Sequence, residues 1–237
     1  MKFIDYNSPE KAVINYTFNS LSYMDVWISS IVEGYIYEKV VKIHNNGYRK
    51  EYTERYGEKE GEAKDWYSNG QISVKQYYKE GKLDGEYKSW DVDGQIEKHL
   101  YYKEYKREGE CKIWWDNGQL IYQGYYKDDK EEGECKEWFN NGQLWHRRYY
   151  KEGKREGECK LWYKKSGQLQ CQEYYKEGKL EGEYKKWYKN RKLQCQCYYK
   201  DGKKEGEYKQ WDKNGNLTEY KIYENGNIVK DLQRMPF

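Results

Sequence analysis

A lysine recurs at a fixed spacing along most of this chain and could form a charged binding surface. The seven members of this lysine row are Lys64, Lys88, Lys112, Lys136, Lys160, Lys185 and Lys209. In a β-sheet, equivalent residues of successive two-strand units lie roughly 10 Å apart, so the ammonium groups would line one face. Such a row could contact anionic lipid headgroups or another polyanion. A glutamate precedes each lysine by two residues, however, and the alternative is a set of cross-strand Lys–Glu ion pairs.

The lysines belong to a block of about 24 residues that recurs seven times. The blocks begin at Gly61, Gly85, Gly109, Gly133, Gly157, Gly182 and Gly206. Each has a glutamate at its second position, a lysine at its fourth and a tryptophan at its sixth. The block from Gly157 has one extra residue. A repeat of this length is typical of one supersecondary unit stacked on copies of itself, not of a catalytic domain built around a pocket.

The other residue types able to do chemistry form no catalytic or metal-binding pattern. His44, His99 and His146 lie far apart, and no nucleophile, phosphate-binding or metalloprotease motif is present. The six cysteines are Cys111, Cys135, Cys159, Cys171, Cys195 and Cys197. They lack the paired C-x-x-C spacing of zinc sites, and other blocks place Ala or Tyr at the third position, which indicates a packing site. We therefore predict no enzyme, no metal and no cofactor.

Two turn signals divide each block into strands. The first is of the Asn-Gly type, as in Ser68-Asn69-Gly70, and the second of the Lys-Glu-Gly type, as in Lys79-Glu80-Gly81. In both, we expect glycine to close a three-residue hairpin loop with a bulge. The segments between the turns are short and rich in Tyr and Trp, so each block is predicted to be one β-hairpin.

The length of the first turn decides which side chains share a face of the sheet. A three-residue turn places the tryptophan opposite the Ile or Leu at the twelfth position, as for Trp66 and Ile72. The second Tyr of each Tyr-Tyr pair, such as Tyr78, would then lie on that same face. The third-position Cys and Tyr residues would lie on the other face, together with the seventh-position aromatic residues such as Tyr67.

These features predict an all-β fold, an elongated single antiparallel meander sheet of about seven hairpin repeats that resembles a solenoid. We expect a short irregular N-terminal cap at residues 1–33, a degenerate repeat at 34–60 and the repeat array at 61–237. Ser8-Pro9-Glu10 resembles the start of a helix. Both ends are expected to protect the open edges of the sheet.

Local departures from the block are where the array could acquire specificity. Lys165 or Ser166 is the extra residue, and Arg191 replaces a turn glycine, so that Asn190 is expected to adopt the left-handed conformation. The glycine that begins each block is expected to lie where neighbouring backbones crowd.

Composition limits the classes of partner. The chain has 44 basic and 41 acidic residues and a formal net charge of +3, which is too little to attract nucleic acid. No secretory signal and no apolar run long enough to span a bilayer are visible, so we expect an intracellular, cytoplasmic protein with reduced thiols.

The pattern G-E-x-K-x-W followed by an N-G-Q-L turn and Y-Y-K-E-G-K resembles the variant form of the MORN repeat, a β-hairpin array. The resemblance covers roughly three quarters of the chain, from Gly61 to the C-terminus. It implies a scaffold or interaction role, sometimes contact with acidic phospholipids, and in bacteria an antitoxin-like label. The composition, rich in Lys, Tyr and Asn, also resembles proteins of large DNA viruses, which would place the chain in the cytoplasm of a host cell.

The function predicted from these features is a non-enzymatic scaffold that mediates protein–protein interaction, including self-association. The first alternative is peripheral association with acidic phospholipids through the lysine row. The second is a carbohydrate-binding ladder of aromatic rings. Buried tryptophans would argue against that ladder, and a file of exposed ones would favour it.

Overall fold

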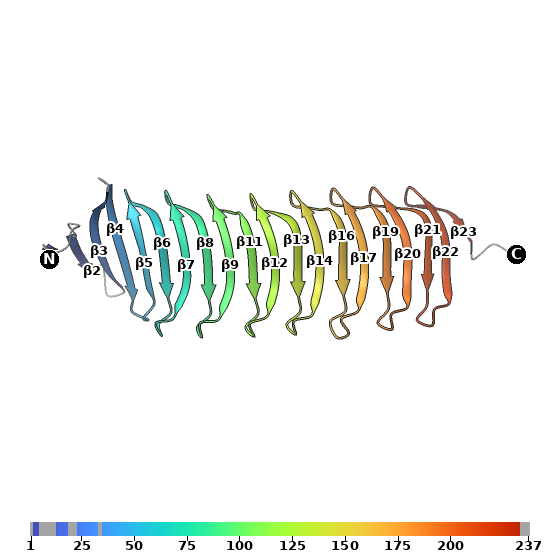
Figure 1. Ribbon diagram of the computed structural model, residues 1–237, viewed down its shortest axis with the longest axis horizontal. Coiled ribbons are helices and arrows are strands. Elements are labelled where there is room, and N and C mark those ends of the chain that lie inside the picture. The colour runs from blue at the N-terminus through green and yellow to red at the C-terminus, as the bar shows by residue number, and fades with distance from the viewer. Residues whose placement is uncertain (1, 5–12, 19–22, 33–34, 233–237) are drawn as a thin grey trace. The chain divides into compact units, whose positions relative to one another are not determined.

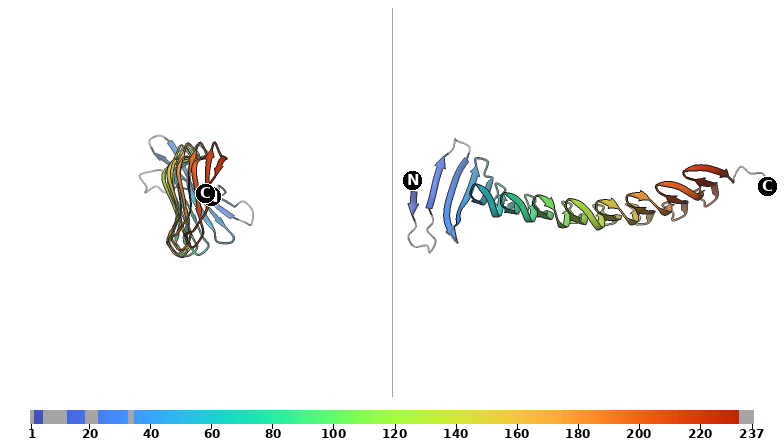
Figure 2. Two further views of the ribbon diagram at one scale, coloured as in Figure 1. Left: turned by 90° about the vertical axis from the view of Figure 1, so that its right-hand side faces the viewer. Right: turned by 90° about the horizontal axis from the view of Figure 1, so that it is seen from above.

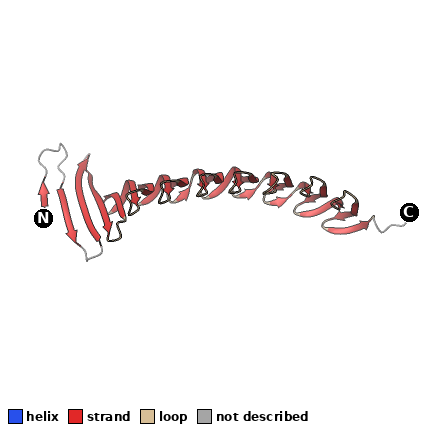
Figure 3. Cartoon of the chain, turned by 90° about the horizontal axis from the view of Figure 1, so that it is seen from below, coloured by secondary structure: helices blue, strands red, loops and turns tan. Residues whose placement is uncertain are grey.

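The computed structural model describes residues 2–4, 13–18, 23–32 and 35–232 of the 237-residue chain. Every regular element in these ranges is a β-strand (Figure 3). The chain divides into an N-terminal unit, Met1–Gly118, and a C-terminal unit, Gln119–Phe237. The expected helix start at Ser8-Pro9-Glu10 lies outside the described residues.

Each unit is an antiparallel meander in which strands pair in chain order (Figures 1 and 2). The N-terminal unit contains β1 (Lys2–Ile4), β2 (Val13–Phe18), β3 (Tyr23–Val32), β4 (Tyr35–His44), β5 (Arg49–Arg55), β6 (Glu58–Trp66), β7 (Ile72–Lys79), β8 (Lys82–Trp90), β9 (Ile96–Lys103), β10 (Lys106–Arg107) and β11 (Gly109–Trp114). The C-terminal unit contains β12 (Leu120–Lys127), β13 (Lys130–Trp138), β14 (Leu144–Lys151), β15 (Lys154–Arg155), β16 (Gly157–Trp162), β17 (Leu169–Lys176), β18 (Lys179–Leu180), β19 (Gly182–Trp187), β20 (Leu193–Lys200), β21 (Lys203–Trp211), β22 (Leu217–Glu224) and β23 (Asn227–Asp231). The predicted all-β meander of hairpins is confirmed within each unit. Where residues 1–33 are described, they form paired strands.

The first turn of the block has the predicted three-residue loop. In the block from Gly61, the Gly70 N–H donates to the Tyr67 carbonyl (3.0 Å) and the Tyr67 N–H donates to the Gln71 carbonyl (2.8 Å). Trp66 consequently lies opposite Ile72, as the three-residue register predicts. The same two hydrogen bonds join His44, Gly47 and Tyr48, so residues 34–60 contain a hairpin of the same form.

The second turn is shorter than expected. Lys79 pairs directly with Lys82, which leaves a two-residue turn in which Glu80 (φ 50°) and Gly81 (φ 72°) are both left-handed. This is the type I′ conformation, whose twist matches that of the flanking strands. The glycine-free connector Glu104–Tyr105 keeps this conformation, with φ of 49° and 69°. The prediction of a three-residue loop was therefore wrong for this turn.

A β-bulge next to the first turn moves the second Tyr of each pair away from the predicted face. Trp66 pairs with Ile72, but its neighbour Asp65 pairs with Val74, so one residue of β7 has no counterpart. Each side chain after the bulge points to the opposite face from the one that simple alternation predicts. The second Tyr therefore contacts the third-position residue, with ring centroids 6.0 Å apart for Tyr87 and Tyr102.

We name the two faces by the block from Gly85. The tryptophan face carries Glu86, Lys88, Trp90 and the first Tyr, Tyr101, whereas the cysteine face carries the third-position residue and the second Tyr. The best-buried side chains lie mainly on the cysteine face, including Ala63 (3% exposed), Cys135 (2%) and Cys197 (2%). All seven sixth-position tryptophans are only half-buried. The core is therefore a thin layer under the cysteine face.

Conformation, more than crowding, explains the glycine that begins each block. These glycines have φ between 71° and 117°. At Gly61, β6 has three residues, 60–62, opposite a single residue of β5, and an added Cβ would meet nothing within 4 Å. Only glycine adopts such a positive φ in a bulge at little cost. Crowding is present at Gly85, where an added Cβ would lie 3.0 Å from the Tyr77 Cβ.

The loop in which Arg191 stands in place of the turn glycine also differs from expectation. Arg191 itself is left-handed (φ 67°), whereas Asn190 keeps negative φ and uses its side chain instead. The Asn190 Oδ1 accepts a hydrogen bond from the Lys192 N–H (3.1 Å) and its Nδ2 donates to the Lys213 carbonyl (2.8 Å). Asn69 makes the same two bonds in a loop that keeps its glycine, so the asparagine supports the loop with either residue at the third position.

Candidate functional site

Each lysine of the row is paired with the glutamate two residues earlier. The six pairs from Lys88–Glu86 to Lys209–Glu207 have Nζ–Oε distances of 2.5 to 2.8 Å, and Lys64 contacts Glu62 in the same way. The expected pairing is present, but within one strand and not across two. The lysine side chains are 24% to 35% exposed. The row is therefore a set of neighbouring ion pairs in partial contact with solvent.

The glutamates collect further donors from the adjacent strand. In the block from Gly61, Glu62 accepts from Tyr77 Oη (2.9 Å) and pairs with Lys75 (2.7 Å) in addition to Lys64. Partial burial raises the pKa of Glu62, but hydrogen bonds from these three groups outweigh it and lower the pKa to about 2. Tyr149 makes the same bond to Glu134 (2.8 Å). This Glu–Lys–Tyr cluster repeats with the hairpin and stabilises the tryptophan face.

The cysteines are packing residues, as their exchange with Ala and Tyr predicts. No disulfide joins the six, all of which lie in the described ranges. Burial raises the pKa of Cys171 to about 12 and that of Cys197 to about 11. Thiols with such pKa values stay protonated near neutral pH and are poor nucleophiles. Among the described residues, no three His, Cys, Asp or Glu side chains are placed to hold a metal ion.

Two of the histidines serve as partners of glutamates. His99 Nε2 lies 2.8 Å from Glu86 Oε1, and His146 Nδ1 lies 3.0 Å from Glu137 Oε2. The hydrogen bond from His146 is the largest of several causes that lower the pKa of Glu137, followed by Arg148. His44 lies at the end of β4, directly before a turn.

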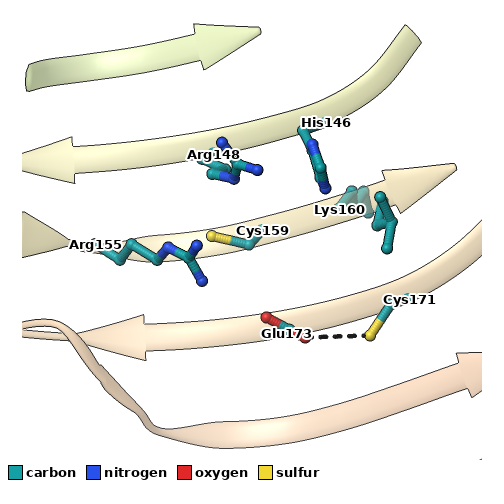
Figure 4. Close-up of a pocket in the computed structure, with 8 residues that line it drawn as sticks. His146, Arg148, Arg155, Cys159, Lys160, Cys171 and Glu173 are labelled. Atoms are coloured by element: carbon teal, nitrogen blue, oxygen red, sulfur yellow. Dashed lines mark hydrogen bonds between the residues drawn. The ribbon is translucent and has the colours of Figure 1, made fainter. Parts of the chain in front are cut away.

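A hollow of about 130 Å³ opens on the cysteine face of the C-terminal unit, between β14, β16 and β17 (Figure 4). It is lined by His146, Arg148, Arg155, Cys159, Lys160, Leu161, Cys171 and Glu173. Arg155 donates to Tyr175 Oη (3.0 Å), which in turn donates to Glu173 (2.7 Å). Cys171 Sγ also donates to Glu173 (3.3 Å). The charged groups of the hollow therefore have partners within the fold, including Arg148 with Glu137 and Lys160 with Glu158.

The sequence patterns considered above did not reveal a second set of acidic residues with a structural role. An Asp or Glu precedes the first glycine of every block, and most of these carboxylates accept the N–H of the first residue in a type I′ turn about 20 residues later. Glu132 accepts from the Glu152 N–H (2.7 Å) and Glu181 from the Asp201 N–H (2.8 Å). The recurrence of an acid before each glycine was the available signal. Within each unit, these acids link successive hairpins.

Aromatic hydroxyls link the hairpins at the opposite end. The seventh-position Tyr67 donates to the carbonyl of Trp90 (2.9 Å), and Tyr188 donates to that of Trp211 (2.9 Å). These tyrosines and the half-buried tryptophans beside them are therefore part of the framework.

Comparison with known proteins agrees with this architecture. A family model described as MORN repeat variant matches residues 59–82, 83–104, 107–128, 131–152, 180–201 and 204–225, which is more than half of the chain. The matches leave out residues 153–179, which include the inserted residue, although this segment also forms a hairpin, with a first loop one residue longer. No curated protein matches significantly. No helix in the described ranges has the length and apolar character to cross a membrane. With its recurring hairpins and these six matches, the chain belongs to the MORN repeat variant family.

Proposed function

We propose that this protein is a non-enzymatic scaffold whose hairpin array binds another protein. The family is a repeat scaffold type and is generally associated with protein or membrane-lipid interaction. The observation that carries the proposal is that the polar groups recurring in every block serve the framework. The glutamates hold lysines and tyrosines, the acids before the glycines hold turn amides, and five of the six cysteines are buried in the core. The outer surface of the array is then the part available for function.

Neutralisation of the lysine row favours a protein partner over a membrane. A surface that attracts anionic lipids needs an excess of positive charge, worth about 1 kcal/mol for each Lys or Arg near the bilayer. Here each lysine of the row has its own carboxylate within 2.8 Å, and the net charge of the chain is only +3. Lipid association through Lys64 to Lys209 therefore remains the second candidate.

Affinity purification of the full chain from its native cell tests the proposal. We expect one or more proteins to co-purify at a constant ratio and to rebind the purified chain in isolation. Recovery of the chain alone, or with lipid only, would contradict a protein scaffold. Size-exclusion chromatography with light scattering would show self-association as a change of mass with concentration.

Vesicle sedimentation tests the lipid candidate directly. We expect binding to vesicles with acidic phospholipids to be no greater than binding to neutral vesicles. Binding that requires acidic lipid and is lost when Lys88, Lys112 and Lys136 are all changed to Gln would instead favour the membrane role.

The carbohydrate-binding ladder is the weakest of the three candidates. Its aromatic rings would have to be open to a sugar, whereas the sixth-position tryptophans are half-buried and Arg49 stacks over the Trp66 ring at 4.6 Å. The proposed intracellular location and the likeness to antitoxin-like and viral proteins stay predictions.

A further inference from the structure

The first-turn loops of the C-terminal unit gather positive charge at the point where the repeat is least regular. We call the six cations of three successive loops the basic edge. They are Lys164, Lys165, Lys189, Arg191, Lys192 and Lys213. Two of the three loops contain the departures from the block, namely the inserted residue and the arginine in place of glycine. Along the sequence, one acidic residue, Asp212, directly adjoins these loops, and its Oδ1 accepts the Asn214 and Asn216 N–H groups.

The cations of the basic edge differ from the lysine row in their contacts. All six are exposed. Within the described part of the chain, no carboxylate forms an ion pair with any of them, whereas every lysine of the row has one. Lys164 and Lys189 lie over the rings of Phe139 and Tyr163 at 5.7 and 5.8 Å, and Lys192 donates to a carbonyl, so these contacts are neutral. An anion that approaches these exposed cations breaks no ion pair and costs little desolvation. The basic edge is thus a charged surface that the fold leaves open.

The three loops are joined to one another by hydrogen bonds. Asn190 Nδ2 donates to the Lys213 carbonyl (2.8 Å), and Lys192 Nζ donates to the Asn214 carbonyl (2.6 Å). Gln168, with its amide oriented to satisfy both atoms, donates to the Lys189 carbonyl and accepts from Arg191 Nε at 2.9 Å. A surface ordered before binding loses less conformational entropy when a ligand binds.

We propose that the basic edge binds an extended acidic segment of a protein partner, an inference that rests on the proposed scaffold role. Consecutive loops are two strands apart, so the three loops span about 19 Å. An extended peptide advances about 3.3 Å per residue, and about six residues would reach all three loops. Carboxylates on such a segment match the lysines and the guanidinium, as in other acidic-motif sites.

The chemistry of the edge fits a peptide better than a bilayer or a nucleic acid. Loop residues 164–167, 189–192 and 213–216 include no exposed aromatic or large apolar side chain. Membrane-surface segments combine basic residues with apolar ones that enter the bilayer. Single-stranded nucleic acids need aromatic rings for base stacking, but Tyr163 and Tyr188 are half-buried and use their hydroxyls on the next hairpin.

Fluorescence anisotropy with a labelled octaglutamate peptide tests the inference on the full chain in 50 mM salt. We expect saturable binding of octaglutamate and none of octaglutamine. The variant K164E/K189E/K192E should weaken binding at least tenfold. The matched control K151E/K176E/K200E changes charge equally at exposed strand ends on the opposite edge of the same unit and should bind within twofold of the unmodified chain. Circular dichroism checks that both variants fold.

Three outcomes would overturn the inference. One is absence of octaglutamate binding, and another is equal weakening by both triple variants, which would assign the effect to net charge. The third is tighter binding of polyuridylate, acidic-lipid vesicles or a second copy of the chain through the same loops. A natural protein partner whose binding is unaffected by K164E/K189E/K192E would leave the scaffold role standing and remove the basic edge from it.

Discussion

The N-terminal and C-terminal units build the same first turn but place different charges on it. The loops of the N-terminal unit carry Asp93 and Asp116 and no Lys or Arg, whereas those of the C-terminal unit carry the six cations of the basic edge. The backbone hydrogen bonds are alike in both units except at Gly167, whose loop is one residue longer, and Asp91 caps its own turn as Asp212 does. The turn is held by main-chain groups, so its outward side chains are free to differ. In this array, the framework repeats and surface charge varies.

The largest loss of stability is expected from changes to the glycine that begins each block, and it should differ between the two units. Gly85 has φ of 117° and an added Cβ would lie 3.0 Å from the Tyr77 Cβ, whereas Gly133 has φ of 74° and open space. Gly85→Ala should therefore lower the free energy of unfolding by about 2–3 kcal/mol and Gly133→Ala by about 1 kcal/mol. Urea denaturation measures both. Equal losses would mean that the bulge tolerates a Cβ alike in the two units.

The next comparison exchanges the third residue of the first turn between the units. Arg191 is left-handed at φ 67°, and Gly70 of the N-terminal unit is left-handed at φ 85°. Arg191→Gly should raise the free energy of unfolding by about 1 kcal/mol, and Gly70→Arg should lower it by a similar amount, because only glycine adopts this conformation without strain. Thermal melts would show opposite shifts. A loss of stability in Arg191→Gly would show that the bond to Gln168 outweighs the strain.

A smaller difference in unfolding free energy is expected between the acids that cap the type I′ turns of the two units. Glu132 accepts the Glu152 N–H at 2.7 Å, but Asp84 reaches the Glu104 N–H only at 3.3 Å. Glu132→Ala should cost about 0.5–1 kcal/mol and Asp84→Ala less. Amide hydrogen exchange at Glu152 and Glu104 measures the protection of each turn separately. Glu132→Gln, which keeps an acceptor, should retain part of the protection at Glu152.

The smallest effect concerns the pH dependence of the glutamate clusters. The pKa of Glu62 is lowered to about 2 in the folded chain, so its contribution is present above the unfolded value near 4.5 and is lost as pH falls towards 2. Because Glu62 and its lysine partners are partly exposed, we expect the ionised Glu62 to stabilise the fold by only about 0.3–0.5 kcal/mol. Glu207, at 54% exposure, should contribute less. Urea midpoints between pH 6 and pH 2.5 should converge for Glu62→Gln and the unmodified chain; a constant offset would contradict the ionic origin.

Local signals in the sequence predicted the hairpins but not the assignment of their faces. Asn-Gly at residues 69–70 marks a three-residue loop, and the pairing of Trp66 with Ile72 follows from it. No residue type marks the bulge that follows one residue later, so the sequence predicted the wrong face for Tyr78. The cap on Glu152 was missed because its acceptor, Glu132, lies 20 residues earlier and meets it only after hairpins stack.

By itself, the sequence determined the number of blocks, the positions of both turns and the pairing of tryptophan with leucine, because each depends on a few adjacent residues. Only the tertiary structure decided that the cysteine face is the buried one, that the lysine row is neutralised within its own strands and that the basic edge is not. The reason is that burial and ion pairing depend on residues from neighbouring hairpins, whose approach is set by bulges and twist and not by local propensity.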